Sequence, residues 1–296
     1  MECAIGRRGE CLLRNELKLL ADALNEMHDG DVIDTNGNIL DQLMYETRCD
    51  TNLCVVENLL SKVRGTEYEA LIQHIRDVAF LSKGPSDPLE WLDNFIINRV
   101  CLQIACNYPK AIKYGGLVMY DFCVNPITAW FADPSSIVNS WKESNWSQFH
   151  IMLNTDHRAG MGIHWVCLAI SIDAQAIYYF DPVGRLPLSG VIQGTPNTSI
   201  YPDGRFISYV QEWINAISNE FGKEGIVLRF RWCSTKHQTG DDRSNCGVYC
   251  LHQLIHLARG KSFDEINANP ISTETITAFR EKIYVPTDNY SPLINE

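Results

Sequence analysis

The chain has no long apolar segment and no excess of positive charge. None of its apolar runs approaches the roughly 20 residues that a helix needs to cross a bilayer, so the sequence predicts no membrane span. Lysine and arginine number 25 against 36 aspartates and glutamates, which gives a formal net charge of −11. Nucleic-acid binding requires a basic surface, so this charge argues against nucleic acid as the main partner. We also find no internal repeat and no low-complexity segment.

The composition is otherwise that of a folded protein, with 45% hydrophobic and 21% charged residues in 296. Residues 1–10 lack the apolar core of a secretion signal, so we expect a protein kept in a reducing compartment. Most of the 11 cysteines are then expected to be buried thiols, because disulfides are rare there. Cys49 and Cys54 could begin a metal site, but no second pair has ligand-like spacing, and we predict no metal.

Apolar stripes of helical period divide the chain into two parts. They cover residues 12–24, 55–63 and 68–81, and they predict helices with one buried face. The Gly- and Pro-containing stretch 83–88 then interrupts the pattern. We therefore predict a helical N-terminal arm over residues 1–83 and a second domain over 84–296, which opens with a helix over 91–102.

The second domain changes from helical to strand periodicity. Residues 163–172 and 176–180 read as strands, and the turn at 173–175 makes them an antiparallel hairpin. A helix is expected over 206–221 and a further strand over 226–232. This order predicts an α+β domain, with helices packed on a mixed or antiparallel sheet.

The residues around Cys246 are the most informative in the chain. Loop-forming residues lead to Cys246 and Gly247, and the apolar positions that follow recur at helical spacing: Val248, Leu251, Leu254, Ile255 and Ala258. Cys246 is therefore predicted to begin a core helix, where unpaired backbone amides favour a thiolate. The alternative is a small apolar side chain buried in the core. Cys250, one turn further along, is expected to be such a core residue.

A thiolate nucleophile needs a base, and the base needs a group that orients it. His164 lies in the first predicted hairpin strand, and Asp181 lies at the end of the second, so the turn brings the two together. Asp181 can accept the imidazole N–H. The alternatives are a hydrogen-bonded core histidine and a turn-forming Asp-Pro pair. Gln238, in the loop before Cys246, can donate to an oxyanion together with the Cys246 N–H.

His252 and His256 are four residues apart on the helix that begins at Cys246. That spacing can bind a metal, but no third ligand is suggested. We expect a solvent-facing pair.

His164-Trp165, Asp181, Gln238 and Cys246-Gly247, in this order, resemble the SUMO-protease and adenovirus-protease clan of cysteine peptidases. The helix from Trp91 resembles the one that opens the catalytic domain there. Further segments are similar to the polyprotein-processing proteases of African swine fever virus and other large DNA viruses: 153–156, 162–166, 237–238, 245–249 and, in the arm, 10–13 and 49–56.

The resemblance implies a papain-like or SUMO-protease-like thiol protease. Cys246 would be the nucleophile, His164 the general base, Asp181 its orienting group and Gln238 part of the oxyanion hole. Trp165 and Gly247 would bind substrate. Trp165 resembles the wall of a narrow channel, which implies cleavage after Gly-Gly or Gly-Xaa because only glycine passes between bulky walls.

The role implied by the resemblance is the processing of viral structural polyproteins during virion maturation. The protein would then act at assembly sites in the host cytoplasm and in the virion. No metal or organic cofactor is implied, and the oligomeric state is left open. Two other readings remain: a protease that removes SUMO or ubiquitin-like modifiers from host proteins, and an inactive binding module on the same fold.

The sequence departs from the family pattern at two places. Gln238 and Cys246 are eight positions apart, a longer spacing than is usual in the family, so the oxyanion donor could lie elsewhere. Asn245 stands where the family commonly has an acidic residue, so one local negative charge is absent.

Overall fold

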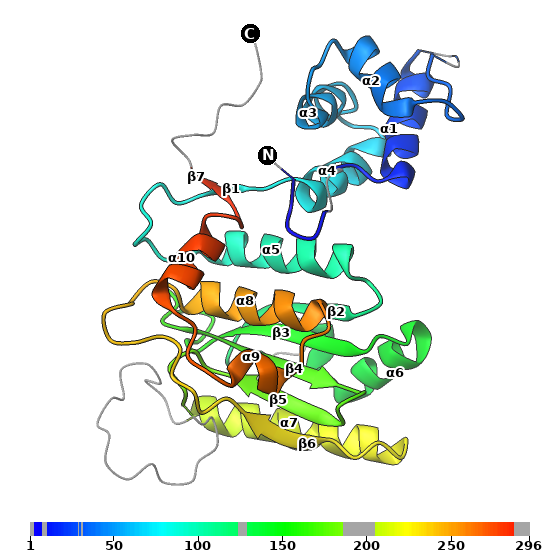
Figure 1. The fold of residues 1–296 in the computed structure, drawn as a ribbon. Coiled ribbons are helices and arrows are strands. Elements are labelled where there is room, and N and C mark those ends of the chain that lie inside the picture. Colours follow the sequence, from blue (N-terminus) through cyan, green and yellow to red (C-terminus); the bar gives the residue numbers. More distant parts are fainter. Residues whose placement is uncertain are drawn as a thin grey trace. The chain divides into compact units, whose positions relative to one another are not determined.

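The computed structural model describes residues 3–7, 11–28, 30, 32–123, 129–185 and 205–286 (Figure 1). They form two compact units, one from the described residues up to Ser86 together with those from Lys282 onward, and one from those between Asp87 and Glu281. Glu10, the first residue of a predicted arm motif, lies outside the described residues. Among the residues described, no helix has the length and apolar character to cross a membrane.

The first unit is helical, as predicted. Its helices are α1 (Arg14–Met27), α2 (Ile39–Thr47), α3 (Asn52–Lys62) and α4 (Tyr68–Ala79). The predicted stripes supply its core, in which Leu20, Val55 and Ile72 are fully buried. Our sequence prediction did not include α2, a helix of 9 residues that begins after a loop, where the Asn38 side chain accepts a hydrogen bond from the backbone N–H of Asp41.

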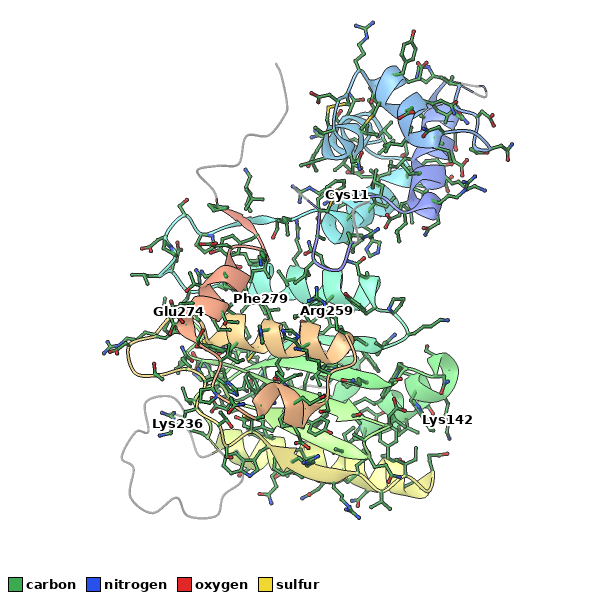
Figure 2. The ribbon with its side chains drawn as sticks, viewed as in Figure 1. Cys11, Lys142, Lys236, Arg259, Glu274 and Phe279 are labelled. Carbon is green, nitrogen blue, oxygen red and sulfur yellow. A yellow bond between two sulfur atoms is a disulfide. The ribbon has the colours of Figure 1, made fainter. Side chains whose placement is uncertain are left out.

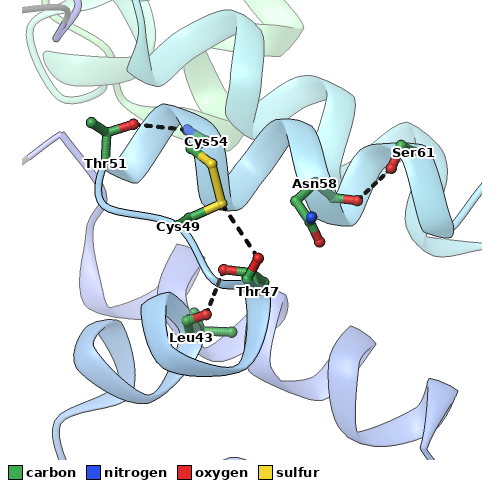
Figure 3. Close-up of a disulfide and its surroundings, with 7 residues drawn as sticks. All are labelled: Leu43, Thr47, Cys49, Thr51, Cys54, Asn58 and Ser61. Atoms are coloured by element: carbon green, nitrogen blue, oxygen red, sulfur yellow. Dashed lines mark hydrogen bonds between the residues drawn. A yellow bond between two sulfur atoms is a disulfide. The ribbon is translucent and has the colours of Figure 1, made fainter. Parts of the chain in front are cut away.

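Two disulfides lie in this unit, so four of the 11 cysteines depart from the expectation that most are buried thiols. Cys3 pairs with Cys11, and Cys49 pairs with Cys54, whose Cα atoms are 5.6 Å apart (Figure 3). Cys49 follows the end of α2, and Cys54 lies in the first turn of α3, where its N–H donates to the Thr51 hydroxyl. The two cysteines considered as metal ligands are therefore bonded to each other. The remaining seven cysteines are thiols, and five of those are buried.

The end of the described chain belongs to the first unit. Strand β1 (Lys83–Gly84) pairs in parallel with β7 (Val285–Pro286). Gly84 lies directly against the Tyr284 ring, where a Cβ atom would collide. Our prediction assigned everything after residue 83 to the catalytic domain, because no local signal marks this return of the chain.

The second unit is built on a five-stranded mixed sheet. Its strands are β2 (Ile112–Met119), β3 (Gln148–Asn154), β4 (Trp165–Ser171), β5 (Ala176–Phe180) and β6 (Arg229–Trp232), in this spatial order. The outer pairs, β2 with β3 and β5 with β6, are parallel, and the inner pairs are antiparallel. The predicted α+β class is confirmed. Strand β2 was not predicted, because Gly115 and Gly116 interrupt its apolar pattern.

Helices cover both faces of this sheet (Figure 1). Helix α8 (Cys246–Ala258) packs on β4 and on α5 (Asn94–Asn107), and α10 (Thr273–Arg280) and α9 (Phe263–Asn267) adjoin α8. On the other face, α7 (Arg205–Lys223) packs with α6 (Pro134–Ser144), which follows the short 3-10 helix η2 (Trp130–Ala132). The core there joins Val166, Leu168 and Ile170 of β4 to Trp213 and Ile217 of α7. The first turns of α8 lie near the beginning of β4, because the Cys250 thiol of α8 contacts the carbonyl of Trp165, the first residue of β4.

Candidate active site

The imidazole of His164 and the carboxylate of Asp181 are in direct contact. Cys167 faces Phe180 in the β4–β5 register, so the start of β4 and the end of β5 lie at the same edge. His164 immediately precedes β4, and Asp181 immediately follows β5. The His164 Nε2 atom lies 2.7 Å from Asp181 Oδ1, and the two residues are 5% and 0% exposed. The hairpin thus brings together the pair that the sequence predicted, although β4 begins one residue later than His164.

The charge state of His164 follows from its neighbours. Burial alone lowers the pKa of the imidazole, but the charge of Asp181 and its hydrogen bond raise it. A hydrogen bond to Cys246 and the charge of Cys246 raise it further, to about 10. Because Nε2 is bound to Asp181, Nδ1 is the ring nitrogen left for the thiol. The arrangement favours an imidazolium at neutral pH.

Cys246 is the first residue of α8 and is 4% exposed. The sequence predicted this start. A helix N-terminus carries a partial positive charge that stabilises an anionic sulfur. Asn245 stands at the N-cap, but its side chain makes no capping hydrogen bond. The first turn of α8 therefore lacks the side-chain cap that most helices of this unit have.

Gly247 explains how α8 approaches its neighbours. A Cβ atom on Gly247 would lie 2.7 Å from Ile97 Cδ1 and 3.3 Å from Trp165 Cδ1. Glycine therefore permits the close contact of α8 with α5 and β4 that seats Cys246 beside His164. Trp165 is itself buried, and its carbonyl oxygen accepts from the Cys250 thiol at 3.5 Å. Cys250 is a core residue, as expected.

Gln238 lies in the loop between β6 and α8 and is buried. Its backbone N–H donates to the carbonyl of Pro182 at 2.8 Å, directly after Asp181. Its side-chain Nε2 donates to the carbonyl of Asp242 at 2.8 Å, and Oε1 has no hydrogen-bond partner among the described residues. One N–H of the amide thus stays available. A role in the oxyanion hole remains a prediction.

The loop before His164 is organised by Asn154 and Asp156, to which we had assigned no role. Asp156 accepts from the backbone N–H groups of Gly162 and His157 at 3.0 and 2.8 Å. Asn154 Oδ1 accepts from the N–H groups of Asp156 and Ile163 at 3.0 and 3.1 Å. An Asn-x-Asp sequence after a strand and before two glycines is a typical sign of such a loop.

His237 is a third residue to which we had assigned no role. Its Nδ1 accepts from the N–H of Ile271 at 3.2 Å, and Nε2 lies 3.0 Å from Asn267 Oδ1, which fits a neutral ring protonated at Nε2. Burial lowers the pKa of His237, and the bond to Asn267 partly offsets this. Its own N–H donates to the carbonyl of Pro182 at 2.9 Å. His237 therefore fastens the Gln238 loop to the segment after Asp181.

The expectation of a solvent-facing pair was wrong for His252, whereas His256 is partly exposed. His252 is buried, and its Nε2 lies 3.0 Å from Nε2 of His256. Phe279 of α10, labelled in Figure 2, packs edge-on against the His252 ring. Burial lowers the pKa of His252 to about 3 and also lowers that of His256, so both rings are neutral. The described residues contain no group of three or more His, Cys, Asp or Glu that could hold a metal ion.

Known proteins provide an independent comparison. Residues 147–292 match the model for the Ulp1 protease family, C-terminal catalytic domain. A putative thiol protease of Acanthamoeba polyphaga mimivirus is 26% identical over 203 residues, which is 68% of this chain and 59% of the relative. The chain thus spans less than two thirds of that protein. A SUMO-1 cysteine protease of African swine fever virus is 21% identical over 247 residues, 80% of this chain and 83% of the relative.

The crystal structure of an African swine fever virus protease has the same fold. It aligns with a TM-score of 0.58 at 19% identity and covers 97% of this chain and 96% of that one. The fold likeness extends over both units, whereas the family match is confined to the second half of the chain. Residues 147–292 therefore match a Ulp1-type catalytic domain, and the chain is similar in sequence and in fold to SUMO-protease-like cysteine proteases of large DNA viruses.

Proposed function

We propose that the protein is a thiol endopeptidase in which Cys246 is the nucleophile and His164 the general base. The observation that carries this proposal is the position of the His164 ring, which interacts with Asp181 through Nε2 and also with Cys246. A thiol at a helix start, a buried imidazole and a carboxylate are the three groups that acyl transfer to sulfur requires.

Each residue has a distinct part in the proposed reaction. The Cys246 thiolate attacks the peptide carbonyl, and the negative charge moves to the carbonyl oxygen. The Cys246 N–H and the free N–H of Gln238 would donate to that oxygen. The His164 imidazolium gives its proton to the leaving amine, and the neutral ring then takes a proton from the water that hydrolyses the acyl-enzyme. Asp181 holds the ring in place and stabilises its charged form.

The substrate we propose is a polypeptide with a Gly-Gly or Gly-Xaa site. This part rests on the resemblance of Trp165 to a channel wall and on the contact between Trp165 and Gly247. Both relatives compared above are proteins of viruses. We therefore propose a role in processing viral structural polyproteins, at assembly sites in the host cytoplasm and in the virion.

A second candidate keeps the chemistry and changes the substrate. The African swine fever virus relative bears the name SUMO-1 cysteine protease, which favours a SUMO-type modifier as the substrate of that protein. Such modifiers would have to present a Gly-Gly terminus to the same channel. The two candidates differ in whether a short peptide is sufficient for cleavage or the folded modifier is required.

A substrate panel tests the proposal. Fluorogenic Gly-Gly-Xaa peptides, SUMO conjugates and ubiquitin conjugates would be compared at equal enzyme concentration. We expect turnover of the peptides, its loss in Cys246→Ser, and no change in the matched thiol control Cys123→Ser, a half-buried cysteine. Turnover of SUMO conjugates alone would favour the second candidate. If folded wild type and Cys246→Ser are equally inert toward all three substrates, the protein is not a protease.

A further inference from the structure

Asn245 stands at the start of α8 but does not act as a cap. Asparagine is favoured at this position because its side-chain oxygen accepts from an unpaired N–H of the first turn. In the same unit, Asp93, Asp133, Ser262 and Ser272 all cap their helices in this way. Asn245 makes no such bond, so its side chain caps neither Gly247 nor Val248, whose N–H groups a capping side chain would take.

Both polar atoms of the Asn245 side-chain amide are instead hydrogen-bonded to side chains outside α8. Its Nδ2 donates to Asp242 Oδ1 at 3.0 Å, and its Oδ1 accepts from Arg280 Nη1 at 3.0 Å. Arg280 ends α10 and is only 2% exposed, and its Nη2 donates to the carbonyl of Glu90. A buried guanidinium with fixed partners cannot follow Asn245 if that side chain turns toward the helix. The bond therefore holds Asn245 away from α8.

Asp242 connects this arrangement to Gln238. Its carboxylate Oδ1 also accepts from the N–H groups of Asn245 and Ser244, at 3.2 and 3.4 Å. Its carbonyl accepts from Gln238 Nε2 at 2.8 Å. This bond fixes the NH₂ end of the Gln238 amide. One loop residue thus orients Gln238 and the backbone just before Cys246.

We infer that Arg280, Asn245 and Asp242 form a positioning relay that aligns the oxyanion donors of the site. Arg280 fixes Asn245, Asn245 fixes the Asp242 carboxylate, and Asp242 holds both the Gln238 amide and the backbone just before Cys246. These three are positioning residues, because none is required to touch the substrate. The inference rests on the proposed function, and it names the residues that position the oxyanion donors of that site.

If the relay acts as proposed, its loss should change the rates of two reactions of the Cys246 thiol differently. Peptide cleavage passes through a tetrahedral oxyanion, which the aligned donors stabilise. Alkylation of Cys246 by iodoacetamide displaces iodide at a saturated carbon and forms no oxyanion. Loss of the relay should therefore slow cleavage and leave alkylation unchanged, because the His164–Cys246 pair stays intact.

The test compares Arg280→Gln and Asp242→Ala with wild type. We expect kcat on a Gly-Gly-Xaa peptide to fall about 10- to 100-fold, with KM and the alkylation rate within about threefold. The matched controls are Lys282→Gln and Asp241→Ala, exposed residues that carry the same charge as their counterparts, and both should behave as wild type. Asp242→Ala, in a loop, provides a second variant if the loss of buried Arg280 prevents folding.

A double variant separates the relay from a general structural role. If Arg280 acts on the site only through Asn245, then removing Asn245 leaves Arg280 nothing to position. Arg280→Gln/Asn245→Ala should therefore lose no more kcat than the slower of the two single variants. Two independent packing defects would instead multiply their losses.

Three results would overturn the relay while leaving the protease intact: an unchanged kcat in both single variants, a parallel loss of alkylation rate, or a double variant whose loss is the product of the two single losses. A wild-type protein that cleaves nothing, and whose Cys246 alkylates no faster than a free thiol, would overturn the proposed function and the relay with it.

Discussion

His164 and Asp181 are separated by 17 positions in the chain, and their side chains meet at 2.7 Å across the open end of the β4–β5 hairpin. The antiparallel register fixes this meeting, because Cys167 faces Phe180 and the two flanking residues continue beyond the paired strands. The positions of the proposed base and its orienting group are therefore set by the sheet, whereas that of the proposed nucleophile is set by a helix that packs on the sheet.

Replacing Asp181 by Asn should move the alkaline limb of activity to lower pH. Burial lowers the pKa of His164, but the charges and hydrogen bonds of Asp181 and Cys246 together outweigh burial and raise this pKa from 6.5 to about 10. The raised pKa means that folding favours the imidazolium, so its contribution to stability is complete below pH 6.5 and is lost as the pH rises through about 10. Removing the Asp181 charge lowers this pKa. The measurement is kcat/KM against pH in both proteins, and a limb that stays in place would contradict the assignment.

Gly247→Ala should destabilise the second unit by about 1–3 kcal/mol, because the added methyl group meets Ile97 Cδ1 at 2.7 Å. Ile97→Val removes that Cδ1 atom, so Gly247→Ala/Ile97→Val should recover part of the loss in both urea denaturation and activity. The control is Gly222→Ala on α7, where no atom lies within 4 Å and alanine should be neutral or stabilising. Equal effects at the two glycines would contradict the packing argument.

Asp156→Ala should reduce kcat about 10-fold, because the loop that leads into His164 loses the acceptor of two backbone N–H groups. Asp156→Asn keeps one carbonyl oxygen and should lose less. The exposed turn residue Asp173, changed to Asn, is the charge control. Kinetics on a Gly-Gly-Xaa peptide provide the measurement. Activity in Asp156→Ala equal to that of Asp173→Asn would mean that the loop is held by other bonds.

Removing the Cys49–Cys54 disulfide should cost the first unit about 2 kcal/mol, the chain-entropy value for so short a loop. We expect Cys49→Ser/Cys54→Ser to unfold at lower temperature than wild type under non-reducing conditions. The bonding pattern itself can be counted: an Ellman titration of the denatured protein should find seven thiols without reductant and 11 after reduction. A count of 11 without reductant would contradict both disulfides.

Local patterns in the sequence predicted the elements that carry the chemistry. The start of α8 at Cys246 and the hairpin that joins His164 to Asp181 both follow from side-chain periodicity and from turn residues, which are short-range signals. The helical character of the first unit followed from the same kind of signal.

The parts that could not be predicted depend on contacts between distant residues. The pairing of β7 with β1 joins Val285 to Lys83, and no local pattern records it. The bond from Arg280 to Asn245 crosses 35 positions, and His252 is buried by Phe279 from another helix. The disulfides were missed because the expected compartment was applied equally to all cysteines, although those of the first unit differ from the rest.

The cysteines of the two units require opposite redox conditions in the buffer. All four that the first unit contains are in disulfides, whereas the second unit holds only thiols, including Cys246. A buffer with strong reductant, the usual choice for a thiol protease, would preserve Cys246 while opening the bonds of the first unit. A buffer without reductant would retain those bonds and leave Cys246 open to oxidation. Rates measured in the two buffers would therefore belong to two different covalent forms of the chain, and each assay should state which form it contains.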